Sequence, residues 1–248
     1  MWPGSQIVKA LRSVFYPPLC AGCSTVLPDQ VPAICPDCRR RIRFTEEAWH
    51  RGNNLEQLFR SFAPYKNQTF TGDKFVRGAA YAYYDKASPI PQIIHNIKFV
   101  GYAELARELG REAAETITKQ ADFFREIDLL IPIALHPKRI RARGFNQSEW
   151  IARGISEVTG IPIDTDHLIR TYNTDQQSLK SYAEREQLGQ IFSVQNPNDL
   201  IGKHVLIVDD VITTGSTIAR ALEVLHPIRN CTYSVFALAY AMHVPVRI

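Results

Sequence analysis

The sequence has no hydrophobic run long enough to cross a lipid bilayer. A membrane-spanning helix needs roughly 18 to 20 consecutive apolar residues, and apolar stretches such as Leu129–Leu135 are far shorter. The first fifteen residues alternate apolar and polar side chains, without the compact hydrophobic stretch of a secretory signal. We therefore expect no membrane span and a cytoplasmic location.

Strong charge bias, internal repeats and low-complexity tracts are also absent. The net charge of the 248 residues is +4, with 45% hydrophobic and 22% charged residues, as in ordinary folded proteins. This composition excludes a disordered chain. The mildly basic balance permits phosphate or nucleic-acid ligands but does not by itself argue for them. The length suits one α/β domain with a small accessory module.

Cysteine is scarce outside one short region. Four of the five cysteines form two Cys-x2-Cys pairs, Cys20 with Cys23 and Cys35 with Cys38. Without an export signal, two such pairs favour a metal over disulfides or free thiols. Four thiolates suit a closed tetrahedral zinc site, which would be structural and not catalytic. The fifth, Cys231, lies in an apolar stretch, where we expect a small buried side chain.

Composition divides the chain into three regions. Residues 1–60 hold the cysteine pairs, several prolines and the basic run Arg39–Arg43, and predict a small zinc ribbon. Residues 61–76 form a polar connector, and residues 77–248 form the main domain. In that domain we predict strands at 77–84, 128–135, 205–208 and 233–240, and helices around 93–97, 105–117, 150–158 and 218–225. Strands that alternate with helices predict an α/β domain with a mainly parallel sheet.

The segment from Val205 to Thr217 combines a buried strand, two acids and a hydroxyl-rich turn. In open parallel sheets, ligands bind beyond the carboxyl ends of the strands, where Asp209 and Asp210 are expected. These acids can accept hydrogen bonds from sugar hydroxyls while a divalent cation offsets their charge. The turn leads into a helix N-terminus, which suits phosphate, through Thr213, Thr214, Gly215, Ser216 and Thr217. The segment predicts a ribose-phosphate site; the alternative is a simple helix cap.

This order of residues resembles the 5-phosphoribosyl-1-diphosphate (PRPP) binding motif of type I phosphoribosyltransferases. From Cys20 to about Ala239 the chain resembles the ComF/GntX family, whose members carry the same N-terminal four-cysteine module. The resemblance implies a type I phosphoribosyltransferase-like domain. It places Asp209 and Asp210 at the ribose hydroxyls, the loop 213–217 around the 5-phosphate, and magnesium with the bound PRPP.

Two further stretches resemble the same family. Ile131–Ser148 is similar to its diphosphate-facing loop, in which His136, Lys138, Arg139, Arg141 and Arg143 would balance the diphosphate. The alternative there is a solvated basic helix start.

The second stretch, Leu168–Arg185, resembles the family's mobile flap. Arg170, Gln176 or Gln177, and Arg185 correspond to the family's positions, whereas Tyr172 stands where a second arginine is usual. The alternative is an exposed loop without a gating role.

The resemblance leaves two functions open. The first, which we favour, is a PRPP-binding ComF-type protein that handles imported single-stranded DNA during DNA uptake, together with DNA-uptake proteins. The basic run Arg39–Arg43, together with Lys9, Arg12, Phe44 and Trp49, would contact the strand through its phosphates and by stacking, unless the run is only a solvated face.

The second function is an active phosphoribosyltransferase, a glycosyltransferase that moves 5-phosphoribosyl from PRPP to a nitrogen acceptor and releases diphosphate. Asp209 and Asp210 would orient the ribose. Lys138, Arg139 and magnesium would assist the leaving diphosphate.

Overall fold

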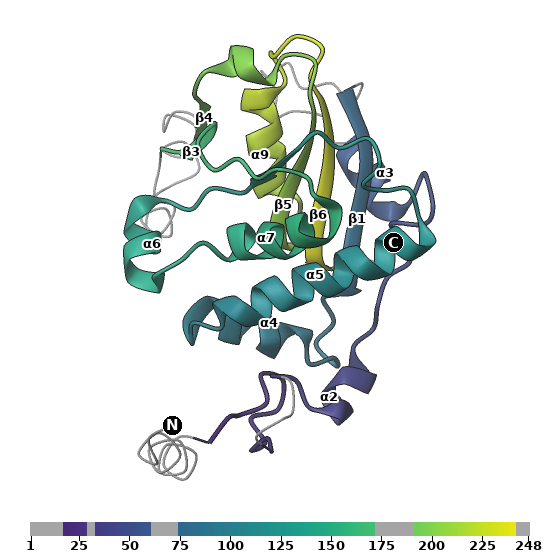
Figure 1. Ribbon diagram of the computed structural model, residues 1–248, viewed down its shortest axis with the longest axis vertical. Coiled ribbons are helices and arrows are strands. Elements are labelled where there is room, and N and C mark those ends of the chain that lie inside the picture. Colours follow the sequence, from purple (N-terminus) through teal and green to yellow (C-terminus); the bar gives the residue numbers. More distant parts are fainter. Residues whose placement is uncertain (1–16, 29–32, 61–73, 172–190, 242–248) are drawn as a thin grey trace, which may run out of the picture.

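A four-stranded parallel sheet runs through the centre of the molecule (Figure 1). The structure is a computed structural model that describes residues 17–28, 33–60, 74–171 and 191–241. The strands lie in the order β1 (Phe75–Tyr83), β6 (Thr232–Tyr240), β5 (His204–Ile212) and β2 (Leu129–Pro132). A separate antiparallel pair consists of β3 (Leu168–Arg170) and β4 (Phe192–Val194). The predicted parallel sheet is confirmed.

Helices cover both faces of the sheet, which is why its strands are continuous apolar runs. Along β5, Leu206 and Val208 belong to one hydrophobic core, and Val205 and Ile207 belong to the other. The first core is completed by α4 (Ile90–Phe99), α5 (Ala103–Gln120) and α7 (Gln147–Thr159). The second is completed by α3 (Asn54–Arg60) and α9 (Ser216–Leu225). Three short helical segments complete the described elements: α2 (Pro36–Arg41), α6 (Pro137–Arg143) and the 3-10 helix at Pro197–Leu200.

Two glycines allow α5 and α7 to pack closely. A Cβ atom at Gly110 would lie 2.3 Å from the carbonyl oxygen of Ile151, and one at Gly154 would lie 2.0 Å from that of Arg107. Both distances are far below van der Waals contact, so each helix is held directly against the backbone of the other. This packing fixes the start of α7, which faces the end of β5.

Short segments cover both edges of the sheet. Beside β1, the backbone N–H of Thr45 donates to the carbonyl of Tyr81, and the N–H of Tyr83 donates to the carbonyl of Arg43. Beside β2, Leu130 forms a bridge with Ile163. These contacts cover part of each edge of the four-stranded sheet.

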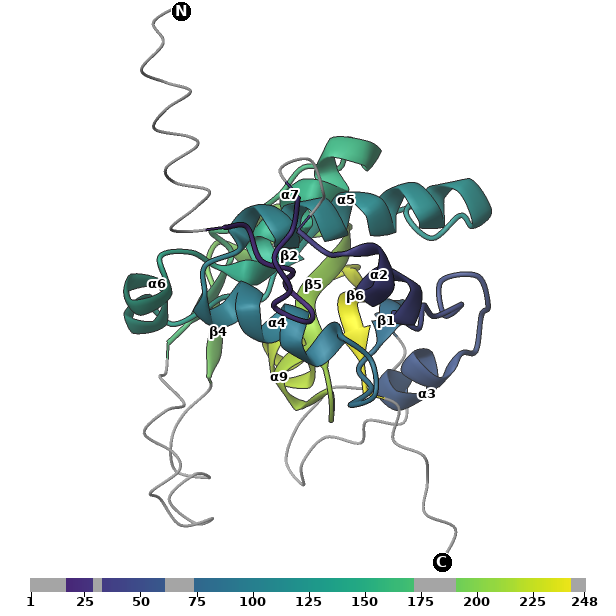
Figure 2. The same cartoon turned by 90° about the horizontal axis from the view of Figure 1, so that it is seen from below.

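The cysteine region lies against α4 (Figures 1 and 2). Cys20 and Cys38 are buried in the same hydrophobic core as Ile93, and Asn96 of α4 donates a 2.8 Å hydrogen bond to the carbonyl of Ala21. The domain boundary predicted after residue 60 stays a prediction, and most of the connector 61–76 lies outside the described residues. Among the described helices, none combines the length and apolar character that a membrane span requires.

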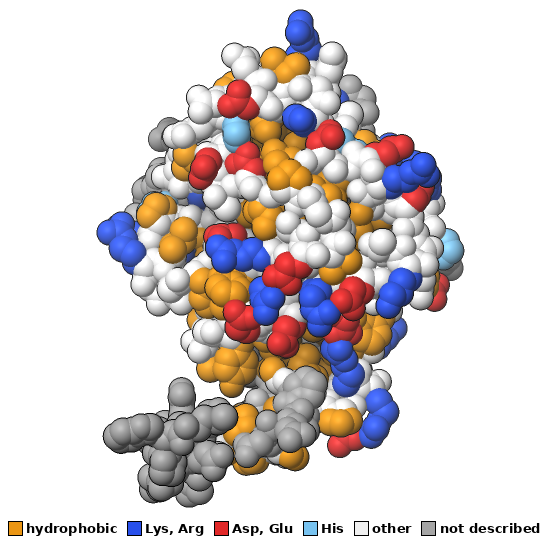
Figure 3. Space-filling model, viewed as in Figure 1, with side chains coloured by type: hydrophobic (Ala, Val, Ile, Leu, Met, Phe, Trp, Pro, Cys, Tyr) orange, Lys and Arg blue, Asp and Glu red, His pale blue; other side chains and the backbone are white. Residues whose placement is uncertain are grey.

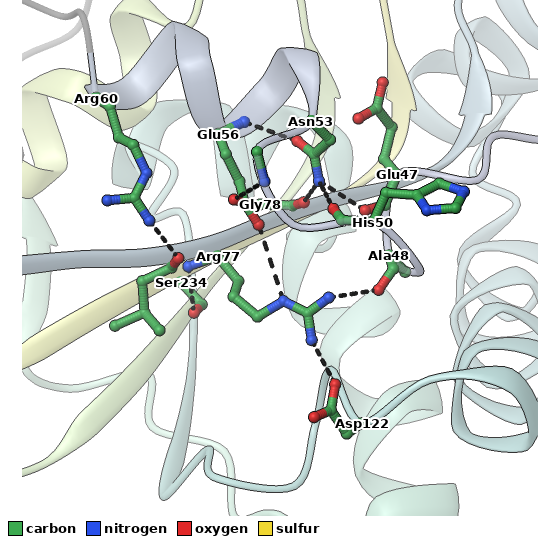
Figure 4. Close-up of polar contacts among 12 residues, drawn as sticks. Glu47, Ala48, His50, Asn53, Glu56, Arg60, Arg77, Gly78, Asp122 and Ser234 are labelled. Carbon is green, nitrogen blue, oxygen red and sulfur yellow. Dashed lines mark hydrogen bonds and ion pairs between the residues drawn. The ribbon is translucent and has the colours of Figure 1, made fainter.

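A buried arginine on the sheet forms hydrogen bonds to the segment before α3 (Figure 4). The guanidinium of Arg77, on β1, donates to the carbonyl of Ala48 and to Asp122, both at 2.7 Å. Its Nε lies 3.8 Å from the carboxylate of Glu56 on α3, which is also buried. Removing one partner of a buried ion pair leaves the other charge without compensation, at a cost of about 3–5 kcal/mol.

We predict that Arg77→Ala lowers the free energy of unfolding by about 3–5 kcal/mol, because Glu56 would keep a buried charge without its arginine. Urea denaturation measures this loss. The matched control is Arg111→Ala, which removes an exposed ion pair with Glu115 and should cost under about 1 kcal/mol. Equal losses in the two variants would contradict the assigned role of Arg77.

Candidate functional site

Two adjacent carboxylates are buried at the carboxyl end of β5. Asp209 is 7% exposed and Asp210 is 4% exposed. Oδ1 of Asp209 accepts hydrogen bonds from the hydroxyl of Ser148 at 3.1 Å and from the backbone N–H of Asp210 at 2.8 Å. Oδ2 of Asp210 lies 2.7 Å from Nζ of Lys98, at ion-pair distance but without the angles of a good hydrogen bond. This arrangement suits an additional cation or sugar hydroxyls.

Burial, and after it the negative charge of Asp210, together raise the pKa of Asp209 to about 7 against the lowering effects of the Asp210 backbone N–H, Lys98 and Ser148. The carboxyl group therefore holds its proton more tightly in the folded protein than in the unfolded chain. Between about pH 4 and pH 7 Asp209 binds more protons in the folded state, so its contribution to the stability of the ligand-free protein falls as the pH rises through this window.

We predict that Asp209→Asn removes this pH-dependent loss, because a neutral amide has no charge to bury. At pH 8 the ligand-free variant should exceed the wild type in stability by roughly 2–4 kcal/mol, and at pH 4 the two should be nearly equal. Urea denaturation at both pH values measures the difference. Glu108→Gln, at an exposed position, is the control that should change neither value. A wild-type stability that rises with pH, with no gain in Asp209→Asn, would contradict the assignment.

The loop after β5 turns into α9 at a glycine, which has no side chain to cap the helix. Gly215 is the residue before the helix and has a φ of +75°, which favours glycine. The N-cap residue makes no side-chain hydrogen bond to α9. The N–H of Ser216 donates to the hydroxyl of Thr214 at 3.4 Å, and the N–H groups that follow it suit an anion. The hydroxyls of Thr214 and Ser216 lie 3.0 Å apart. The predicted loop residues line one small hollow together with Asp209: Thr213, Thr214, Gly215, Ser216 and Thr217.

The predicted cationic residues begin at the same edge of the sheet. Pro132 of β2 pairs with Val208 of β5, so the connections that follow these strands leave side by side. His136 caps α6, because its Nδ1 accepts a 3.2 Å hydrogen bond from the N–H of Lys138. Lys138 is exposed, and Arg139 lines a cavity that Lys98 also lines. Arg139 thus reaches the surroundings of Lys98, the residue paired with Asp210.

The flap residues divide between the described and undescribed parts of the chain. Arg170 on β3 is 9% exposed, with its guanidinium 5.4 Å from the ring centroid of Phe192. It lines a second cavity that also contains Pro137 and Asn146, next to α6. Arg185 and nearly all of the predicted flap lie outside the described residues. The roles of both arginines stay predictions.

Lys98 and Ser148 were not predicted as site residues. Lys98 ends a helix that the sequence marks only by Ile93, Ile94 and Ile97, and no motif distinguishes it. Ser148 falls within the stretch that resembles the family, but nothing in that stretch indicates a contact with Asp209. Only the packing of α4 and α7 against the end of β5 brings these two side chains to the acids.

The four predicted cysteines gather into one cluster. Their sulfur atoms all lie within 4.8 Å of one another, and the Sγ atoms of Cys23 and Cys35 are 3.7 Å apart. Tetrahedral zinc with bonds of about 2.3 Å holds its sulfur ligands about 3.8 Å apart, and all five cysteines of the chain are free of disulfides. The backbone N–H of Cys35 donates to Sγ of Cys20 at 3.2 Å, and that of Cys38 donates to Sγ of Cys35 at 3.4 Å. The cluster can hold a metal such as zinc.

The thiols of the cluster differ in acidity. Hydrogen bonds from Thr25 lower the pKa of Cys23 to about 6, whereas burial raises the pKa of Cys38. A metal binds thiolates, so occupancy of this cluster would require proton release and would strengthen as the pH rises.

The basic run Arg39–Arg43 is engaged with neighbouring groups. Its arginines contact Glu112 (Arg39), Asp37 (Arg40), the carbonyl of Ala87 (Arg41) and Asp85 (Arg43). Exposed ion pairs of this kind contribute at most about 1 kcal/mol each, so these partners hold the run only weakly.

The chain matches the model of the phosphoribosyl transferase domain over residues 140–243. It is 31% identical to the DNA utilization protein YhgH of Escherichia coli O157:H7 over 157 residues, which are 62% of this chain and 68% of that protein. It is 26% identical to Competence protein F of Haemophilus influenzae over 212 residues, 84% of this chain and 90% of that protein.

Among solved structures, the glutamine PRPP amidotransferase of B. subtilis aligns with a TM-score of 0.36 and 25% identity. That alignment covers 52% of this chain and 25% of the amidotransferase. Since the likeness to YhgH extends over two thirds of that protein and the acid pair and the loop 213–217 lie within the matched domain, this chain belongs to the ComF family of phosphoribosyltransferase-like proteins.

Proposed function

We propose that this protein binds PRPP together with magnesium at the end of β5 and acts in the handling of imported single-stranded DNA. The proposal that PRPP binds rests on the acid pair and the start of α9. The acids can accept hydrogen bonds from the ribose hydroxyls, and the start of α9 can donate hydrogen bonds to the 5-phosphate. The names of the relatives, DNA utilization protein and Competence protein F, support the DNA part.

The ligand would lie across the carboxyl edge of the sheet. Its 5-phosphate would accept hydrogen bonds from the loop 213–217 and the first N–H groups of α9. Its ribose hydroxyls would donate to Asp209 and Asp210. Its diphosphate would face the cationic start of α6, at His136, Lys138 and Arg139, and a magnesium ion would neutralise part of its charge.

Burial of Asp209 and Asp210 supports this assignment. Two carboxylates that lie side by side away from water destabilise the ligand-free protein unless hydrogen bonds or cations compensate them. Lys98 is the compensating cation that the described residues provide. A ligand with two vicinal hydroxyls and an accompanying metal would satisfy the acids more fully.

We further propose that the metal of the cysteine cluster is zinc and that it is structural. All four ligands would be protein thiolates, which leaves no open coordination position for a substrate. Beside it, the run Arg39–Arg43 would contact the phosphates of a DNA strand. Replacing Arg39, Arg40 and Arg41 with glutamine should then weaken single-strand binding and flatten its dependence on salt.

An active phosphoribosyltransferase is the second candidate function. The observation that favours it is the position of Arg139, which shares a cavity with the lysine paired to Asp210 and would stabilise the charge of a departing diphosphate. The transfer would break the C1–O bond to diphosphate and form a C1–N bond to the acceptor, whose proton leaves to solvent.

Diphosphate release separates the two candidates. The purified protein would be incubated with PRPP and magnesium, with a panel of nitrogen acceptors, and with or without single-stranded DNA. Acceptor-dependent release supports the transferase. PRPP and strand binding without release supports the binding protein, and the absence of any PRPP binding would contradict both.

A further inference from the structure

A cavity of about 400 Å³ opens between the end of α4 and α6, next to the proposed PRPP site. It is lined by Lys98, Phe99, Val100, Gly101, Arg139, Ala142 and Arg143. Phe99 is 69% exposed and Val100 is 57% exposed. Figure 3 shows hydrophobic side chains exposed at the left of the view, where α6 and the end of α4 lie in Figure 1. Two adjacent large apolar side chains this open to water indicate a surface for a ligand.

Aromatic and cationic groups are combined in this cavity. The guanidinium carbon of Arg143 lies 5.5 Å from the ring centroid of Phe99, within the range of a cation–π contact. The ring of His95 lies 4.9 Å from the same phenyl ring. A flat base can stack on a phenyl ring or a guanidinium plane, while a neighbouring Arg or Lys binds its phosphate.

The charged side chains that line this cavity are all positive. Its charged lining residues are Lys98, Arg139 and Arg143, and no acidic side chain among the described residues lines it. Lys98 lies 2.7 Å from Asp210, and three arginines of the run Arg39–Arg43 are likewise paired with carboxylates. Figure 3 shows Lys/Arg and Asp/Glu side chains intermixed across the middle of the view. A lining that carries three cationic side chains and, among the described residues, no acidic one attracts an anion.

We propose that this cavity binds a nucleobase together with its phosphate, supplied by a single strand of DNA or by a free nucleotide. The base would stack on Phe99 and Arg143, and the phosphate would contact Arg139. This site adjoins the one assigned to PRPP and shares Arg139 with it, but its stacking surface on Phe99 takes no part in the proposed PRPP contacts. Lys98 adjoins both sites, because it lines the cavity and its Nζ lies 2.7 Å from Asp210.

The test measures the binding of a fluorescent oligothymidylate to the full chain by anisotropy. Phe99→Ala and Arg143→Gln should each weaken binding roughly five- to hundredfold, the range expected for the loss of one stacked base. Phe99→Trp, which keeps an aromatic ring at this position, should bind the oligothymidylate like the wild type. Ile201→Ala and Arg111→Gln, both at exposed positions away from the cavity, are the matched apolar and basic controls and should bind like the wild type.

Two competitors separate base from phosphate and strand from nucleotide. An abasic strand of equal charge should compete at least fivefold more weakly than oligothymidylate, because it has no ring to stack. Thymidine monophosphate that competes in a Phe99-dependent manner supports a free nucleotide as the natural source. Competition by strands alone supports DNA. Equal binding by Phe99→Ala and wild type, or equal competition by the abasic strand, would overturn the proposal.

PRPP binding serves as the independent readout. Phe99→Ala should bind PRPP with magnesium as the wild type does, since Phe99 contacts neither the acid pair nor the loop 213–217. If the wild type fails to bind PRPP but its strand binding depends on Phe99, the proposed function is wrong and the cavity assignment stands. If the wild type binds PRPP but Phe99→Ala binds the DNA strand as tightly as the wild type, the cavity assignment is wrong and the proposed function stands.

Discussion

Replacing Asp209 and Asp210 together with alanine is expected to abolish magnesium-dependent PRPP binding. Each carboxylate would lose a charge-assisted hydrogen bond to a ribose hydroxyl, which contributes about 1.5–3 kcal/mol. Two such losses weaken binding by about a hundred- to ten-thousandfold, which would take a micromolar Kd to between about 100 μM and 10 mM. Isothermal titration of wild type and variant with PRPP, with and without magnesium, measures the change.

The variant should remain folded, because it removes two buried negative charges. Only Lys98 loses its ion-pair partner, and its side chain is partly exposed to water. Its thermal melt provides the check. The control Glu108→Ala removes an exposed acid on α5 and should leave PRPP binding unchanged. A folded double variant with wild-type affinity would show that the ribose lies elsewhere.

Removing the metal from the cysteine cluster is expected to destabilise the N-terminal part of the protein. Cys20 and Cys38 are buried in the core that contains α4, so loosened thiols would expose apolar surface of that core as well. Metal analysis of untagged protein should give one zinc per chain. Strong chelators or Cys38→Ser should lower the melting temperature by several degrees, at about 2–4 °C per kcal/mol for a chain of this size.

Cys231→Ala is the matched control for the metal. Cys231 is buried and lies outside the cluster, so the variant should lose some packing energy but keep its full zinc content. A metal-free wild type with an unchanged melting temperature in chelator would defeat the structural role of the cluster.

The sequence predicts the central sheet well because each of its strands is buried on both faces. Apolar and polar residues do not alternate in Val205–Val208 or along most of β6. These short apolar runs contain β-branched residues and lie between turn signals, which indicates buried strands. Gly160 marked the end of α7 and has the left-handed conformation of a helix C-cap there. The short pair β3 and β4 was missed, because three residues are too few to show a period.

The candidate site was predictable only where its residues are contiguous. Asp209, Asp210 and the loop to Thr217 follow one another in the chain, so one motif contains both the sugar and the phosphate groups. Lys98 and Ser148 come from other helices, and their approach to the acids depends on how α4 and α7 pack on the sheet. Phe99 was predicted neither as exposed nor as part of a cavity, because helical periodicity does not show which residues end beside α6.

A crystal structure of the protein with PRPP and magnesium tests the central claim most directly. We predict the 5-phosphate in the loop 213–217 at the start of α9, with the ribose hydroxyls donating to Asp209 and Asp210. Ligand density at any other surface, or acids that keep their present partners and leave the ribose without contact, would contradict the account.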